Sequence, residues 1–142
     1  MIVIETTNQQ KVKRINLKQL HKDLKRIFVC LDISSKKLSI LLCDNAFIKK
    51  LNKKYFKKFS VTDVIAFPLA DSFQPDYLGE VIVSVEEAVR IAKRLDCRWQ
   101  DELNLYLIHG ILHLIGYDDR TNLKRARMEK KQEELLKLKD KG

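Results

Sequence analysis

Two of the chain's three histidines, His109 and His113, stand four residues apart in the apolar stretch Leu107–Tyr117. In a helix this spacing places both imidazoles on one face, one turn apart, where they can hold one metal ion. Gly116 then allows the chain to turn, so that Asp119 can return as a third ligand. A lone histidine in an apolar helix is usually a core residue, but this combination favours a metal. Three protein ligands with one open position are typical of a catalytic metal site.

The acid that completes the site is one of two neighbours, Asp118 and Asp119. Either carboxylate could ligate, and either could instead orient a histidine ring from outside the coordination sphere. We take Asp119 as the third ligand, with Zn²⁺ as the single ion. The open position would then hold a water molecule whose pKa falls toward about 7 in favourable sites. His109 and His113 would act catalytically through that water, which can attack a carbonyl carbon or a phosphorus atom.

The residue after the first histidine separates two kinds of hydrolase. Zinc peptidases of the HExxH type carry a glutamate there as general base. This chain has Gly110, which cannot transfer a proton. A metallopeptidase is therefore the less favoured alternative.

Charge favours an anionic partner. The 142 residues carry a formal net charge of +9, which suits nucleic acid before a membrane surface, although a basic surface can also serve solubility alone. Six lysines and no acid lie between residues 49 and 58, with aromatic residues among them. From this run we select Lys53, Lys54, Tyr55 and Lys57 as candidate substrate-binding residues, because lysines follow a phosphate backbone and aromatic rings stack on unpaired bases. The alternative is a solvated helix face with Tyr55 in the core.

Length and composition predict one domain over residues 1–142. No apolar leader follows the first four residues, and the apolar stretch Leu103–Tyr117 is too short and too interrupted to span a bilayer. The three cysteines form no CxxC pair, which predicts a reducing cytoplasm. We expect Cys30, Cys43 and Cys97 to be small core residues.

The elements that must position the site are predicted from periodicity and capping residues. Strands are expected over residues 1–6, 38–42, 62–68 and 78–83. Helices are expected over 17–31 after the cap Asn16, from Asp44 or Asn45 to 55, from Ser84 to 95, over 99–115 and over 123–138. Strands and helices do not alternate regularly, which predicts an α+β fold with a small mixed sheet and helices mainly on one side.

Three further polar residues are kept outside the predicted catalytic set. Asp63 follows a threonine, which is ordinary turn chemistry, although it could orient a loop beside the site. Glu80 is the only acid on its strand and could reach the cleft or simply face solvent. Ser84, with Glu87 three residues on, is most simply a helix cap.

Several motifs together resemble a known family. The segment His109–Asp118 (HGILHLIGYD) resembles the signature of the bacterial YbeY endoribonucleases, also called rRNA maturation factors. The other matching segments keep the family's order and spacing: Leu51-Asn52 with Tyr55 and Thr62–Pro68, similar to "LN…Y…TDVLSFP"; Leu78–Ser84, similar to "LGDIVIS"; and Arg127-Met128-Glu129 with Gln132, similar to the C-terminal helix.

The resemblance implies a metalloprotease-like, zincin-like site helix in an α+β fold. It implies a cytoplasmic, metal-dependent endoribonuclease specific for single-stranded RNA. Its partners would be rRNA and the ribosomal small subunit, with roles in processing the 3′ end of 16S rRNA and in ribosome quality control; neither a membrane nor DNA is expected. Two residues depart from the family pattern: Asp119 replaces a histidine ligand, and Phe56 replaces an arginine linked to substrate phosphate.

Two points stay open at this stage. Either water or the RNA's own 2′-OH could attack the phosphorus, and a cyclic 2′,3′-phosphate product would favour the second route. The alternative function from another class is a non-catalytic RNA-binding or ribosome-binding factor that keeps the metal for stability, which Phe56 supports.

Overall fold

The computed structural model describes residues 2–33, 36–56, 64–68 and 75–138. In this part of the chain the helices and strands follow one another in the predicted order, with one π-helical segment that periodicity did not predict. The elements are β1 (Val3–Asn8), α1 (Leu17–Cys30), β2 (Lys37–Cys43), α2 (Asn45–Leu51), the π-helical segment η1 (Asn52–Phe56), β3 (Val64–Pro68), β4 (Tyr77–Ser84), α3 (Val85–Leu95), α4 (Trp99–Leu114) and α5 (Asn122–Leu136).

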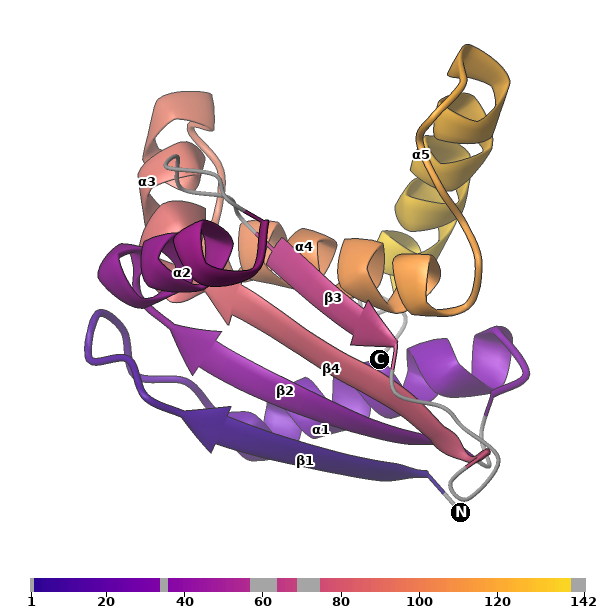
Figure 1. Ribbon diagram of the computed structural model, residues 1–142, viewed down its shortest axis with the longest axis horizontal. Coiled ribbons are helices and arrows are strands. Elements are labelled where there is room, and N and C mark those ends of the chain that lie inside the picture. The colour runs from indigo at the N-terminus through magenta and orange to yellow at the C-terminus, as the bar shows by residue number, and fades with distance from the viewer. Residues whose placement is uncertain (1, 34–35, 57–63, 69–74, 139–142) are drawn as a thin grey trace.

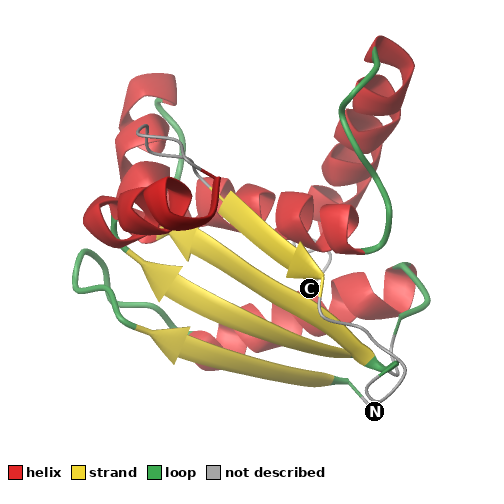
Figure 2. Ribbon diagram, viewed as in Figure 1, coloured by secondary structure: helices red, strands yellow, loops and turns green. Residues whose placement is uncertain are grey.

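Four strands form one mixed sheet in the order β1-β2-β4-β3. The strands β1, β2 and β4 are parallel, and β3 pairs with β4 in antiparallel orientation. Helix α1 lies behind the sheet and α2 lies in front of it in the view of Figures 1 and 2. The prediction of an α+β fold with a small mixed sheet and helices mainly on one side is confirmed.

Local hydrogen bonds explain where the helices begin. Asn16 accepts from the backbone of Gln19, and Asp44, rather than Asn45, caps α2. Ser84 caps α3 by accepting from the Glu87 backbone, as predicted. The side chain of Glu87 pairs with Arg90. Each cap satisfies a backbone N–H that the helix itself leaves without a partner.

The main core lies on the α1 and α4 side of the sheet. Leucines and isoleucines on alternate positions of β2 face α1, whereas a smaller core on the opposite face lies beneath α2. The smaller core consists of Cys43, Ile48, Ile65 and Ile82. The expectation that all three cysteines are core residues is wrong, because Cys30 and Cys97 are exposed and only Cys43 is buried. No described helix is both long and apolar enough for a membrane span.

Helix α4 approaches the sheet closely at Gly110. A Cβ atom built there would lie 2.7 Å from Cγ1 of Val81 and 3.2 Å from Cγ2 of Val64. The glycine thus lets the backbone of α4 pack closely on β4 and β3, one residue after His109. The position that carries a glutamate base in HExxH peptidases has no space for a side chain here.

We expect Gly110→Ala to destabilise the protein by about 1 kcal/mol. Overpacking a core costs about 1–3 kcal/mol, which outweighs the gain of about 1 kcal/mol in helix propensity. Urea unfolding measures the effect. Asn104→Ala is the matched control, because Asn104 lies on the same helix and is only half-buried; it should be neutral or stabilising. Equal stability of Gly110→Ala and wild type would contradict the close approach.

Candidate metal centre

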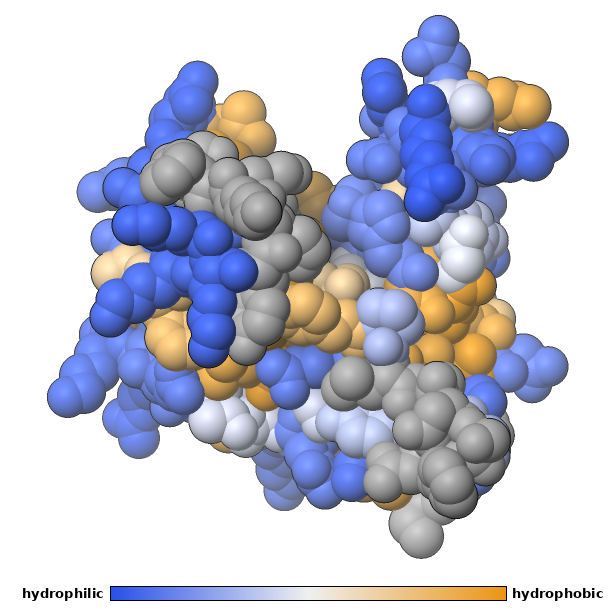
Figure 3. All heavy atoms as spheres, in the orientation of Figure 1, coloured by the Kyte–Doolittle hydropathy of each residue, from blue (hydrophilic) through white to orange (hydrophobic). Residues whose placement is uncertain are grey.

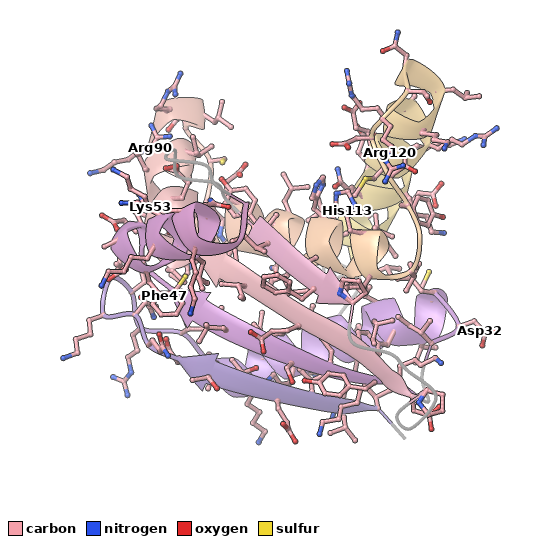
Figure 4. All side chains as sticks on the ribbon, viewed as in Figure 1. Asp32, Phe47, Lys53, Arg90, His113 and Arg120 are labelled. Carbon is pink, nitrogen blue, oxygen red and sulfur yellow. The ribbon has the colours of Figure 1, made fainter. Side chains whose placement is uncertain are left out.

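The two histidines meet at one point above α4. Nε2 of His113 lies 2.9 Å from Nε2 of His109, and the ring planes are inclined by 75°. Both side chains are half-buried, and His113 stands in the hollow between α3 and α5 (Figure 4). Two ring nitrogens directed at one point are the arrangement that a shared ion requires.

Asp119 lies close enough to the histidines to offer a third ligand atom. One ligand atom from each of His109, His113 and Asp119 lies within 4.8 Å of the others. Gly116 makes this return possible, because the chain turns there with φ +108°, a conformation that favours glycine. Asp119 is exposed, so the cluster is open to solvent on the carboxylate side.

Asp118 is engaged elsewhere. Its carboxylate accepts from the backbone N–H of Arg120 at 3.1 Å and pairs with Nζ of Lys124 at 3.5 Å. The hydrogen bond from Arg120, with the charge of Lys124 beside it, lowers the pKa of Asp118. This carboxylate therefore braces the turn that carries Asp119, and the structure gathers Asp119 rather than Asp118 with the histidines.

A residue that sequence reasoning left out of the site orients the first histidine. Nδ1 of His109 lies 2.6 Å from Oε1 of Gln132 on α5. A carboxamide oxygen only accepts, so the ring proton lies on Nδ1 and the Nε2 lone pair is directed toward His113. Gln132 thereby fixes the tautomer that can bind a metal. Its only signal in the sequence was its place in a segment resembling the family's C-terminal helix.

The residues present fit a divalent metal. Two nitrogens at about 2.0–2.1 Å from a tetrahedral Zn²⁺ stand about 3.4 Å apart, slightly more than the separation observed here. A small outward rotation of the rings therefore admits an ion. Neutral imidazole with one carboxylate is also a donor set that zinc accepts.

We expect metal affinity to be constant near neutral pH and to fall in acid. Burial lowers the pKa of His113 below its ordinary value of 6.5, and the adjacent His109 adds to the shift. The ring is therefore neutral at pH 7 and needs to lose no proton before it binds. Below its pKa it is protonated, and the apparent affinity decreases as pH falls. Competition with a chelator between about pH 5 and pH 8 measures this; an affinity that declines already between pH 8 and pH 7 would contradict it.

Of the candidate substrate-binding residues, Lys53 lies away from the histidine pair. Lys53 and Lys54 are exposed in η1, and Figure 4 shows Lys53 on the opposite side of the hollow from His113. Tyr55 belongs to the same π-helical segment, whereas Lys57 lies outside the described residues. The structure does not bring Lys53 next to the metal ligands, so any contact it makes with substrate occurs at a distance from them.

The three residues kept outside the catalytic set have different outcomes. Ser84 is the cap of α3, and Asp63 lies outside the described residues. Glu80 pairs in register with Phe67, one position from Val81, whose side chain contacts the helix at Gly110. Because side chains alternate along a strand, Glu80 faces away from the histidines.

Comparison with known proteins places the chain beside one family. A family model described as endoribonuclease YbeY matches residues 4–139. Proteins named endoribonuclease YbeY from Syntrophus aciditrophicus and Syntrophotalea carbinolica are 35% and 34% identical to this chain, over 96% of it and over 89% and 95% of their own lengths. A solution structure from Thermotoga maritima is similar, with a TM-score of 0.69 and 28% identity, covering 96% of this chain and 87% of the other.

Proposed function

The chain belongs to the endoribonuclease YbeY family, and we propose that it is a metal-dependent endoribonuclease that cleaves single-stranded RNA. The observation that carries the proposal is the convergence of His109, His113 and Asp119 around one point open to solvent. A three-ligand cluster with an accessible side is the arrangement of catalytic rather than structural metal sites. The family match supplies the class of substrate.

The roles of the residues follow from their contacts. His109, His113 and Asp119 would hold one divalent ion, for which we propose Zn²⁺. When bound, such an ion polarises a phosphodiester and assists the attacking oxygen. Gln132 holds the His109 ring in its metal-binding tautomer. Asp118 holds the turn before Asp119 through Arg120 and Lys124. The exposed carboxylate of Asp119 therefore stays near the ring nitrogens of the two histidines.

The surface around the cluster suits a nucleic acid strand. Figure 3 shows a hollow between α3 and α5, with mostly hydrophilic residues on the α5 side of it. The formal net charge of the chain is +9, and exposed Lys53 lies across the hollow from His113, with exposed Lys54 next to it in η1. Cations at that distance attract the phosphate backbone without reading its sequence. We propose that Lys53 and Lys54, with Tyr55 and Lys57, bind the substrate strand away from the cleavage point.

We further propose that the RNA is ribosomal, that the partner is the small subunit, and that the protein works in the cytoplasm as a single domain. Unpaired Cys30, Cys43 and Cys97 agree with a reducing compartment. The family match over residues 4–139 is what supports the ribosomal assignment.

The test is cleavage of single-stranded and duplex RNA of the same sequence by protein loaded with Zn²⁺ or Mn²⁺, with and without chelator. We expect internal cleavage of the single strand only, and only with metal. Binding of RNA without cleavage under every metal condition would refute the enzyme and favour the non-catalytic RNA-binding alternative. Cyclic 2′,3′-phosphate ends would identify the 2′-OH as the attacking group.

A further inference from the structure

A pocket of about 420 Å³ lies beside the ligand-bearing turn, between that turn and α5. We call it the α5 pocket. It is lined by Ile115, Gly116, Tyr117 and Asp118, which join His113 to Asp119, and by Lys124 and Arg127. The pocket is therefore built partly from the segment that connects two metal ligands.

The turn borders open space. A Cβ atom built at Gly116 would have no atom within 4 Å, so the space that a side chain would enter there is open. Tyr117 is anchored by its backbone N–H, which donates to the Leu112 carbonyl at 2.9 Å, and its side chain packs against the main core while remaining partly exposed. A half-buried tyrosine beside open space offers an aromatic surface to a ligand.

The charges along the pocket are mostly positive. Asp118 neutralises Lys124, and Arg125 donates to the backbone carbonyl of Asp119 at 3.4 Å. Among the residues that the structure describes, exposed Arg127 has no ion-pair partner. A guanidinium without a partner at the mouth of a pocket is suited to the two oxygens of a phosphate.

The cations near the start of α5 lie where the helix dipole disfavours positive charge. The first turns of α3 and α4 carry two acids each, as the helix dipole favours, whereas those of α1, α2 and α5 carry none. Lys124, Arg125 and Arg127 instead crowd positive charge near the positive end of α5. Charges that disfavour the helix by itself become favourable when an anion binds beside them.

We propose that the α5 pocket binds an unpaired nucleotide of the RNA strand next to the one being cleaved, with its phosphate on Arg127 and its base against Tyr117. This inference rests on the proposed ribonuclease function. The pocket is lined by Asp118, which is the neighbour in the chain of the candidate ligand Asp119. A duplex cannot place a base there without unpairing it, so the pocket would select single strands.

The test separates binding from cleavage. Affinity for a short labelled single-stranded RNA is measured with chelator present, at several salt concentrations, for wild type, Arg127→Ala and Tyr117→Leu. We expect each substitution to weaken binding about five- to tenfold, and Arg127→Ala to reduce the slope of log affinity against log salt by about 0.7. Arg127→Lys should be intermediate, and Tyr117→Phe should bind as wild type does.

Arg14→Ala is the matched control. Arg14 is an exposed arginine beside the first turn of α4, and the metal ligands begin near the other end of that helix. Equal RNA affinity of Arg127→Ala and Arg14→Ala would overturn the proposed pocket.

Cleavage assays form the second part of the test. A raised KM with unchanged kcat for Arg127→Ala supports the pocket. Wild type that binds RNA through Arg127 but never cleaves it would refute the proposed function and still support the pocket. Wild type that binds no RNA would overturn both proposals.

Discussion

Replacing His113 with alanine is expected to abolish RNA cleavage, with a loss of about a thousandfold or more in kcat/KM. The side chain provides one of the two ring nitrogens that meet 2.9 Å apart, so its removal leaves two of the three candidate ligands found among the described residues, His109 and Asp119. Metal catalysis contributes several kcal/mol to a transition state, and each 1.36 kcal/mol is a factor of ten in rate. Initial rates on single-stranded RNA, with metal content measured on the same samples, give the result.

His21→Ala is the matched control for this substitution. His21 is the remaining histidine of the chain; its Nε2 lies 2.7 Å from Oγ1 of Thr6, between α1 and β1. Its removal deletes the same chemical group outside the metal cluster and should leave cleavage close to wild type. Folding of both variants is checked by circular dichroism. Equal cleavage by a folded His113→Ala variant and wild type would show that the measured nuclease does not use this site.

Replacing Gln132 with leucine is expected to weaken metal binding by about ten- to a hundredfold without unfolding the protein. The leucine has a similar volume but cannot accept from Nδ1 of His109, so the ring is no longer held in one tautomer. Outer partners of metal-bound histidines typically contribute this much to affinity. Competition with a chromophoric chelator at pH 7 measures the dissociation constant.

Gln132→Glu tests whether the acceptor is what matters. A carboxylate at the same position also accepts from Nδ1 of His109, so the metal affinity of this variant should equal or exceed that of wild type. If the leucine variant binds metal as tightly as wild type, then the 2.6 Å contact is incidental to the site. If metal binding is weakened equally in the leucine and the glutamate variants, the effect comes from the packing of α5 and not from the hydrogen bond.

The histidine pair could be predicted from the sequence because helical spacing alone places His109 and His113 on one face. Asp119 was predictable from Gly116, which permits the turn between His113 and Asp119. Gln132 was not predictable in this way, because it lies 23 residues from its partner and meets it only through the packing of α5 on α4. Long-range contacts of this kind depend on how helices pack, and periodicity carries no information about that.

The elements of the fold were largely predictable, since caps such as Asn16 and Ser84 act through neighbours three residues away. The strand order was not, because placing β4 between β2 and β3 depends on contacts between distant segments. Residue type alone did not predict the burial of the cysteines. Cysteine is usually buried, yet Cys30 and Cys97 are exposed, at the end of α1 and just beyond α3. The approach of Gly110 to Val81 likewise appears only once the helix is docked.

The most direct measurement is metal stoichiometry by equilibrium dialysis followed by elemental analysis, on wild type and on Asp119→Ala. With His109, His113 and Asp119 as the ligands, wild type binds one divalent ion per chain. The variant loses a ligand, so its affinity should fall by more than the roughly hundredfold that the loss of an outer partner can cost. Asp118→Asn, which alters the neighbouring carboxylate, should keep the ion. Wild type that binds no ion, or Asp119→Ala that binds it as tightly as wild type does, would contradict the account.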